Sequence, residues 1–180
     1  TDGSYALSKQ SQFVRFYPTH LGFIAKDKAG NLFEYGAAYK SAEGSESIQS
    51  ASVSIGPNTN TFNGIYEWKL VKHTNAKGQF VQYHYGLPSD ADSEESSVPS
   101  QNILAVTKIT YGLNQANLNS IHIHYENRPD GFTSYQTGFK QHTQHRIKSI
   151  EVKHGNRTLW SYDLAYEYQA GDSLYPSKHE

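Results

Sequence analysis

Strict alternation of apolar and polar residues is the feature that most constrains how this chain can fold. The alternation is clearest in TLWSYDLAYEY, residues 158–168, where every second side chain from residue 160 onward is aromatic or leucine. Successive side chains of a β-strand point to opposite faces, so a period of two is typical of a half-buried antiparallel strand. We therefore expect the large residues to share one face, and the pattern favours burial of that face in the core. These residues are Trp160, Tyr162, Leu164, Tyr166 and Tyr168.

Two further pairs of β-prone runs are each separated by a short polar loop that contains glycine, as in a β-hairpin. The paired runs are 20–26 with 31–36, and 66–73 with 79–86. In the second pair, alternation places large side chains on one face of each arm. They are Tyr66, Trp68 and Leu70 in the first arm, and Val81, Tyr83 and Tyr85 in the second. Two similar hairpins indicate a repeating architecture.

The rest of the chain continues in strands, and no stretch has sustained helical spacing. Further strands are expected at 103–112, 119–127 and 145–154, with a short one at 52–55. Two Ser-, Asn- or Asp-rich stretches, 37–64 and 87–102, are expected to be loops. The sequence therefore predicts an all-β fold in which antiparallel hairpins form a curved sheet or a sandwich.

Composition excludes several classes of function. The 180 residues are enough for one domain, and 16 Lys and Arg against 17 Asp and Glu give a net charge of -1, so no nucleic-acid partner is expected. The chain has no cysteine, which excludes disulfides and thiolate metal sites. No apolar run approaches the length of a membrane span, so no membrane contact is expected. We interpret residues 1–180 as a single β-rich segment of a longer protein.

The motif IHIHYE, residues 121–126, raises the question of a metal site. Alternation puts His122, His124 and Glu126 on one face of a strand, as three metal ligands would be presented. The polar face of an ordinary strand has the same pattern, and we favour that interpretation, with no bound cofactor. A zinc site would need further ligands converging at about 2.0–2.2 Å from the metal. Candidates are His84, His142 and His145.

Several short motifs follow one another over about residues 13–168. They are KDKAGNLFEYG, YEWKLVKHTNAKGQFVQYHYG, ITYG, IHIHYENRPDGFTSYQTGF and HRIKSIEVKHGNRTLWSYDLAYEY. Their order resembles the hairpin motifs of the SpvB/TcB-like family, which comprises the B components of bacterial insecticidal toxin complexes and their virulence-plasmid relatives. The sequence departs from the family's Asp-x-x-Gly-Asn turn, because Asn75 stands near the usual Asp and Gln79 replaces the Asn. Ile147 also replaces the usual Leu.

The resemblance implies a non-catalytic segment of a secreted, Rhs/YD-like shell that encloses a toxin payload. Its partners would be other segments of the shell, the payload and a translocation component. The resemblance also implies that Glu126, Arg128 and Asp130 form a structural turn element at the end of a strand, where charges pair or cap the turn. The run Pro129-Asp130-Gly131 supports a turn independently, because Pro presets φ and Gly accepts positive φ.

Two other functions stay open at this point. A secreted carbohydrate-binding β-sandwich would be favoured by an open cleft lined by Trp68, Trp160 or surface tyrosines, since aromatic rings stack on sugars. A metal-dependent activity at His122 and His124 would be favoured by a converging third ligand. No Gly-x-Ser-x-Gly elbow and no Gly-rich phosphate loop occurs in the sequence, so we expect no enzyme.

Overall fold

The computed structural model describes residues 3–6, 13–19, 22–36, 52–54, 65–86, 104–113, 118–136 and 141–167. The expected loop 87–102, most of the loop 37–64 and Tyr168 lie outside these residues. No helix in the described part of the chain is long and apolar enough to span a membrane.

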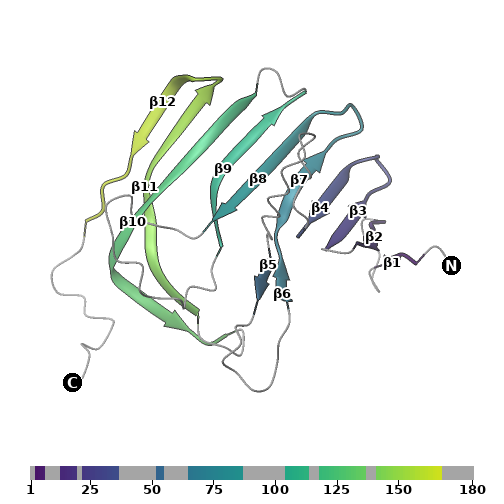
Figure 1. Ribbon diagram of the computed structural model, residues 1–180, viewed down its shortest axis with the longest axis horizontal. Coiled ribbons are helices and arrows are strands. Elements are labelled where there is room, and N and C mark those ends of the chain that lie inside the picture. The colour runs from purple at the N-terminus through teal and green to yellow at the C-terminus, as the bar shows by residue number, and fades with distance from the viewer. Residues whose placement is uncertain are drawn as a thin grey trace, which may run out of the picture.

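Ten antiparallel strands form one open, curved sheet, in chain order except that β5 and β6 are left out (Figure 1). Their bounds are β1 (Tyr5–Ala6), β2 (Arg15–Pro18), β3 (Phe23–Lys26), β4 (Leu32–Tyr35), β7 (Leu70–Thr74), β8 (Phe80–Gly86), β9 (Ala105–Gly112), β10 (Asn119–Ser134), β11 (Gln141–His154) and β12 (Arg157–Asp163). A separate two-stranded ladder joins β5 (Ser52–Ser54) to β6 (Ile65–Trp68). The all-β prediction is confirmed, in its curved-sheet form.

A side-chain carboxylate closes the hairpin between β3 and β4. Asp27 Oδ1 accepts hydrogen bonds from the backbone N–H groups of Ala29 and Asn31, both at 2.9 Å. Asp27 Oδ2 accepts a third bond from the Asn31 side chain at 2.7 Å. The bonds from Asn31 hold the pKa of the Asp27 carboxyl below its ordinary value. Gly30 completes the turn at a φ of 84°, which glycine adopts without steric cost.

The hairpin between β7 and β8 has the same turn chemistry with amides in place of the carboxylate. Asn75 Oδ1 accepts bonds from the backbone N–H groups of Lys77 and Gln79, both at 3.0 Å. Gly78 takes a φ of 80°. Asn75 and Gln79 therefore make the hydrogen bonds that Asp27 and Asn31 make in the first turn. The prediction of two similar hairpins is confirmed.

The run expected as one strand at 66–73 is divided at Lys69. Before this residue β6 pairs with β5, and after it β7 pairs with β4 and β8. The Lys69 carbonyl accepts a bond from the Gly36 N–H at 2.9 Å, and its ammonium group binds Glu67 at 2.8 Å. The alternation within residues 66–73 predicts one continuous strand. Pairing with β5 and β4, which are distant in sequence, divides it into two.

The hairpin of β10 and β11 is longer than predicted. The turn expected at Pro129-Asp130-Gly131 lies inside β10, which continues to Ser134. Residues 128–131 have no ladder partners, because Asn127 pairs with His145 and Phe132 already pairs with Thr143. The expected end of the strand is therefore a wide bulge, after which pairing resumes.

The ladder aligns apolar side chains into rows that cross several strands. One row passes through all strands from β8 to β12 and consists of Tyr83, Ile109, Ile121, Val152 and Trp160. Such directly opposed pairs stabilise a sheet. Of the described apolar side chains, Ala25 and Val71 are buried, while Trp160 and Tyr162 on the outermost strand are 59% and 56% exposed. The expected burial of the Trp160 face is therefore wrong for the described residues, because β12 is an edge strand.

The first hairpin turn provides a test of its side-chain chemistry. We expect Asp27→Ala to lower the melting temperature, because three hydrogen bonds to the turn are lost. Asp27→Asn should stay close to wild type near neutral pH, since asparagine closes the equivalent turn at residue 75. Because the folded-state pKa of Asp27 is lowered, its stabilisation is present above the ordinary value of 3.8 and is lost as pH falls through the folded-state pKa. Thermal unfolding followed by circular dichroism measures both variants, and equal melting temperatures for Ala and Asn would contradict this role.

Candidate functional site

Three consecutive hairpins share one irregularity in their ladders. The first strand of each hairpin also pairs with the last strand of the preceding hairpin. In that ladder the first strand has one extra residue, which has no partner on the preceding strand. The extra residues are Val71 in β7, Thr107 in β9 and Lys148 in β11. A bulge of this kind bends the strand and increases its twist. The three bulges therefore contribute to the curvature seen in Figure 1, where β10 and β11 curve along their length.

A tyrosine hydroxyl donates a hydrogen bond to a backbone carbonyl at each bulge. The tyrosine lies on the following strand or just beyond the end of that strand. The Tyr85 hydroxyl donates to the Leu70 carbonyl at 2.8 Å. The Tyr125 hydroxyl donates to the Val106 carbonyl at 2.9 Å, and the Tyr166 hydroxyl to the Ile147 carbonyl at 2.5 Å. In every case the acceptor is the residue just before the extra one. We call these three contacts the tyrosine latches.

Burial favours the protonated form of the Tyr85 and Tyr125 hydroxyls. Burial, with smaller effects of Tyr83 and Glu67, raises the pKa of Tyr85 to about 12. Burial also raises the pKa of Tyr125. The third latch is more exposed, and there the Arg146 guanidinium lies 4.0 Å from the Tyr166 ring centroid. A protonated hydroxyl is needed to donate to a carbonyl, so this environment favours the latched state.

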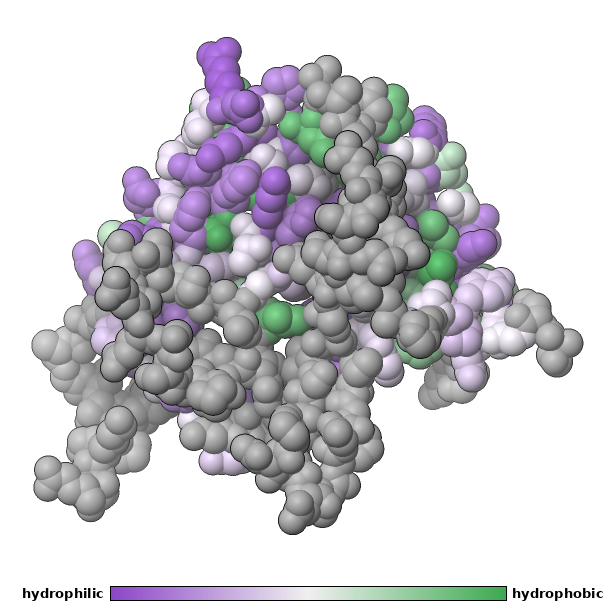
Figure 2. Space-filling view, viewed as in Figure 1, coloured by the Kyte–Doolittle hydropathy of each residue, from purple (hydrophilic) through white to green (hydrophobic). Residues whose placement is uncertain are grey.

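The register of the ladder places mostly polar side chains on the opposite face of β8 to β11. Hydrophilic residues predominate in Figure 2 where Figure 1 places β10 to β12. On this face His84, Lys108 and His122 lie directly opposite one another on three neighbouring strands. Burial and then the Lys108 charge lower the pKa values of both histidines. The predicted faces of IHIHYE are confirmed, with Ile121 and Ile123 paired on the apolar side.

The candidate metal ligands are not brought together in the described residues. His124 Nε2 lies 3.6 Å from a Glu151 carboxylate oxygen, and His84 is separated from His122 by the strand that carries Lys108. His142 Nδ1 lies 2.8 Å from the Thr133 hydroxyl, further along the β10–β11 ladder. His145 lies opposite Asn127 in the same ladder. No three potential ligands in the described ranges form a group that could hold a metal.

The residues predicted as a structural element form two separate ion pairs. Glu126 accepts a bond from Arg146 Nε at 2.6 Å, across the β10–β11 ladder. Arg128 donates two bonds to the Asp130 carboxylate, at 2.9 and 2.8 Å, within the wide bulge. The Arg128 guanidinium also lies 5.3 Å from the Phe132 ring centroid. Of the three predicted residues, Glu126 therefore belongs to the β10–β11 ladder, and Arg128 and Asp130 belong to the bulge.

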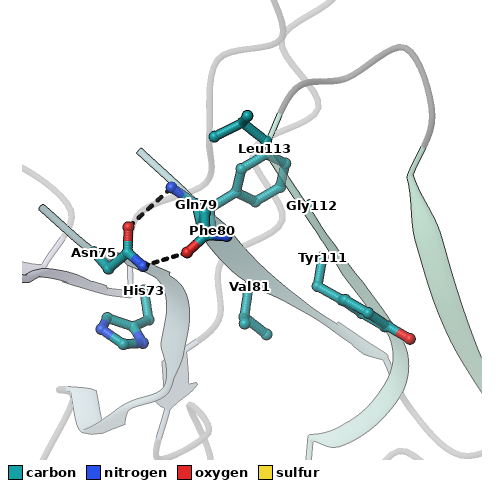
Figure 3. A pocket seen from close by; sticks show the side chains of 8 residues that line it. All are labelled: His73, Asn75, Gln79, Phe80, Val81, Tyr111, Gly112 and Leu113. Atoms are coloured by element: carbon teal, nitrogen blue, oxygen red, sulfur yellow. Dashed lines mark hydrogen bonds between the residues drawn. The ribbon is translucent and has the colours of Figure 1, made fainter. Parts of the chain in front are cut away.

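A small cavity of about 340 Å³ lies beside the β7–β8 turn, and Figure 3 shows the side chains that line it. They are His73, Asn75, Gln79, Phe80, Val81, Tyr111, Gly112 and Leu113. Asn75 Nδ2 donates to Gln79 Oε1 at 2.8 Å, so the two side-chain amides in the cavity wall bind each other and stabilise the turn. His73 stacks on Phe33 with ring centroids 4.5 Å apart. The cavity thus belongs to the packing of the hairpin.

Sequence reasoning missed the tyrosine latches. Tyr85 and Tyr166 are recognisable only as members of alternating faces, and the latch contacts depend on bulges that alternation does not reveal. A signal was nevertheless present, because a tyrosine recurs near the end of the second arm of three successive hairpins, in QYHYG, IHYEN and LAYEY. Trp68, a candidate for sugar binding, instead packs edge-on against Phe23, with ring centroids 5.0 Å apart.

Solved structures share this fold. The chain is similar to the N-terminal domain of the effector protein SpvB from Salmonella typhimurium strain LT2, with a TM-score of 0.57, 14% identity, and 91% of this chain and 69% of that domain covered. It is also similar to TcdB2-TccC3-Cdc42, with a TM-score of 0.55 and 17% identity, covering 84% of this chain and 9% of that one. A Photorhabdus luminescens Tc holotoxin pore matches 81% of this chain and 8% of its own, with a TM-score of 0.54 and 15% identity. No protein-family model and no curated protein matches the sequence.

Removing a latch hydroxyl should weaken the sheet. We expect Tyr85→Phe and Tyr125→Phe each to lower the free energy of unfolding by about 1 kcal/mol, the usual net value of one hydrogen bond. In a domain of this size the melting temperature then falls by roughly 2–4 °C. Tyr162→Phe is the matched control, because that side chain is exposed and its hydroxyl has no hydrogen-bond partner among the described residues. Phe variants at 85 and 125 that melt with the control would refute the latches.

The raised pKa of Tyr85 predicts a loss of stability in alkali. Unfolded tyrosine releases its proton near its ordinary pKa of 10.0, whereas the pKa of the folded Tyr85 is raised to about 12. Over this range the unfolded state binds fewer protons, so stability is intact below pH 10.0 and falls as pH rises toward about 12. Urea unfolding at a series of alkaline pH values should show a shallower fall for Tyr85→Phe than for wild type. An unchanged slope would contradict the assignment.

The lowered pKa values of His84 and His122 predict a second loss of stability, in acid. The unfolded histidines bind protons near 6.5 and the folded ones only at lower pH. Stability should therefore fall as pH drops below 6.5, before the carboxylates titrate. His84→Asn and His122→Asn should reduce this fall, and His154→Asn, at an exposed position near the β11–β12 turn, should leave it unchanged. Melting temperatures measured across this pH range decide the matter.

Proposed function

We propose that this chain is a non-catalytic wall segment of a SpvB/TcB-like bacterial toxin-complex protein, which is secreted and encloses a toxin payload. The observation that carries this proposal is the ten-stranded sheet, to whose curvature three successive latched bulges contribute. A broad curved sheet of this kind is suited to form a wall. The similarity of fold to the SpvB domain and to TcdB2-TccC3 supports the same role.

The ionic side chains support a structural role. Glu126 binds Arg146 across the β10–β11 ladder, and Glu151 binds Lys153 within β11 at 2.7 Å, so both pairs hold side chains along the sheet. We propose that Glu126, Arg128 and Asp130 stabilise the bulged end of β10. The Arg128–Asp130 pair holds the four residues without ladder partners, and the Glu126–Arg146 pair anchors the ladder just before them.

The open edge of the sheet supports the proposed partners. β12 is the last strand of the described sheet, and the row of apolar side chains that crosses β8 to β11 ends on its exposed Trp160. An exposed edge strand with an apolar face tends to pair with another strand. In the proposed wall, another segment of the shell would continue the sheet from this edge, and the payload and translocation component would contact the finished shell.

A graft tests the wall function. We expect residues 13–167, placed in the TcdB2-TccC3 chain instead of its matching segment, to give a soluble protein that protects an enclosed polypeptide from added protease. A graft of the SpvB N-terminal domain is the positive control, and an unrelated β-sandwich of equal length is the negative control. Protection is measured by gel analysis of the enclosed polypeptide over time.

Two results would contradict the proposal, one from the graft and one from a separate binding experiment. One is a soluble, well-assembled graft whose polypeptide is degraded as fast as in the negative control. The other is binding of polysaccharide by the isolated chain that is lost in Trp160→Ala, since this would favour the carbohydrate-binding alternative. Trp160 and Tyr162 are exposed on β12, so the second experiment addresses the aromatic surface that such binding would need.

A further inference from the structure

Lys108 lies at the centre of a row of basic side chains on the polar face of the sheet. It is directly opposite His84 on β8 and His122 on β10. Opposed residues of an antiparallel pair have Cβ atoms about 4.5–5.5 Å apart, so the three side chains are immediate neighbours. No acidic side chain in the described ranges forms an ion pair with Lys108. The row therefore carries a positive charge that the described residues do not balance.

Two buried hydroxyl groups flank this row. Thr110 and Ser120 lie opposite each other, and both residues are only 6% exposed. Thr110 Oγ1 lies 3.4 Å from His84 Nε2, and Ser120 Oγ lies 3.1 Å from His122 Nε2. Hydroxyl, imidazole and ammonium groups can all donate hydrogen bonds. The row and its neighbours thus gather donors of three kinds at one place.

The nearest carboxylate is already engaged. Glu151 lies opposite His122, but it binds Lys153 at 2.7 Å and lies 3.6 Å from His124. The bond from Lys153 lowers the pKa of Glu151, which therefore stays ionised in that pair. The charged and titratable side chains that face the row from the surrounding strands are Glu34, Lys72, His124, Glu151, Lys153 and Asp163.

We propose that His84, Lys108 and His122, with the hydroxyls of Thr110 and Ser120, bind an oxyanion of the phosphate class. A tetrahedral oxyanion offers acceptors in several directions, which suits donors from three strands. The row contains lysine, which acts as a point charge, and no arginine, whose planar fork matches carboxylates. The anion supplies the negative charge that the row lacks. This binding is separate from the wall function and does not depend on it.

The proposed site responds to pH through its two histidines. Protonation of His84 and His122 adds two positive charges, and an imidazolium donates from both ring nitrogens, so the anion binds more tightly as pH falls. The bound anion in turn offsets the repulsion between these histidines and Lys108. Phosphate should therefore reduce the loss of stability that acid causes in the free chain.

The test is titration of the complete chain with inorganic phosphate, by calorimetry and by thermal unfolding, at about pH 6 and about pH 8. We expect tighter binding at the lower pH. Lys108→Gln should weaken binding at least about tenfold, the effect of losing one charge-assisted hydrogen bond. Lys108→Arg keeps the charge and should retain most of the affinity. Lys148→Gln is the matched control, because it removes an exposed lysine elsewhere on β11 and should bind as wild type.

Two further titrations identify the chemistry of the ligand. A phosphate monoester that binds as well as inorganic phosphate would place the natural ligand among phosphorylated molecules, and weaker binding would favour the free ion. Acetate should bind far more weakly than either. The proposal is overturned if phosphate does not bind, if acetate binds equally well, or if Lys108→Gln binds phosphate as tightly as wild type does. The graft experiment reads protection of a polypeptide, so its failure is distinguishable from each of these results.

Discussion

The hydrogen-bond ladder between adjacent strands is the interaction on which this structure depends. In the described residues few apolar side chains are buried, and no large side chain is fully buried. Each strand of the large sheet contacts its neighbours in the sheet through backbone pairs and through rows of opposed side chains. Stability is therefore distributed along the ladder, and local faults in the ladder matter more here than in a protein with a thick core.

The tyrosine latches show how such a ladder can bend without losing cohesion. A bulge interrupts pairing on one side of a strand, and a hydroxyl from the strand on the other side, or from its extension, binds the carbonyl next to the interruption. The same arrangement occurs in β7–β8, β9–β10 and β11–β12, although the extra residue is Val, Thr and Lys in turn. The backbone position is repeated while the side chain varies. This tolerance is consistent with a shared fold at 14–17% identity.

Local sequence pattern predicted strands from residue 20 onward, their faces and both similar turns, because each depends on residues close together in the chain. It did not predict β1 and β2, which are short and show no alternation. It did not predict the division at Lys69, where β5 and β4 compete for adjacent residues. Alternation placed Trp160 on a face correctly, but whether a face is covered depends on the strand's position in the sheet. The resemblance predicted a structural role for Glu126 but not its partner Arg146, which is 20 residues away. Side-chain partners across a ladder follow from register, and the bulges that shift register leave no periodic signal.

The three bulges do not lie on one line across the strands. Lys72, Thr110 and Lys153 occupy a common row of the ladder, and the extra residues are displaced from it by one residue in β7, three in β9 and five in β11. The fold line of the sheet is thus oblique, and it advances by two residues with each hairpin. An oblique line of bends tilts the strands relative to the axis about which the sheet curves, as the stagger between strands does in closed barrels. The two-residue spacing of the bulges therefore sets the tilt of these strands.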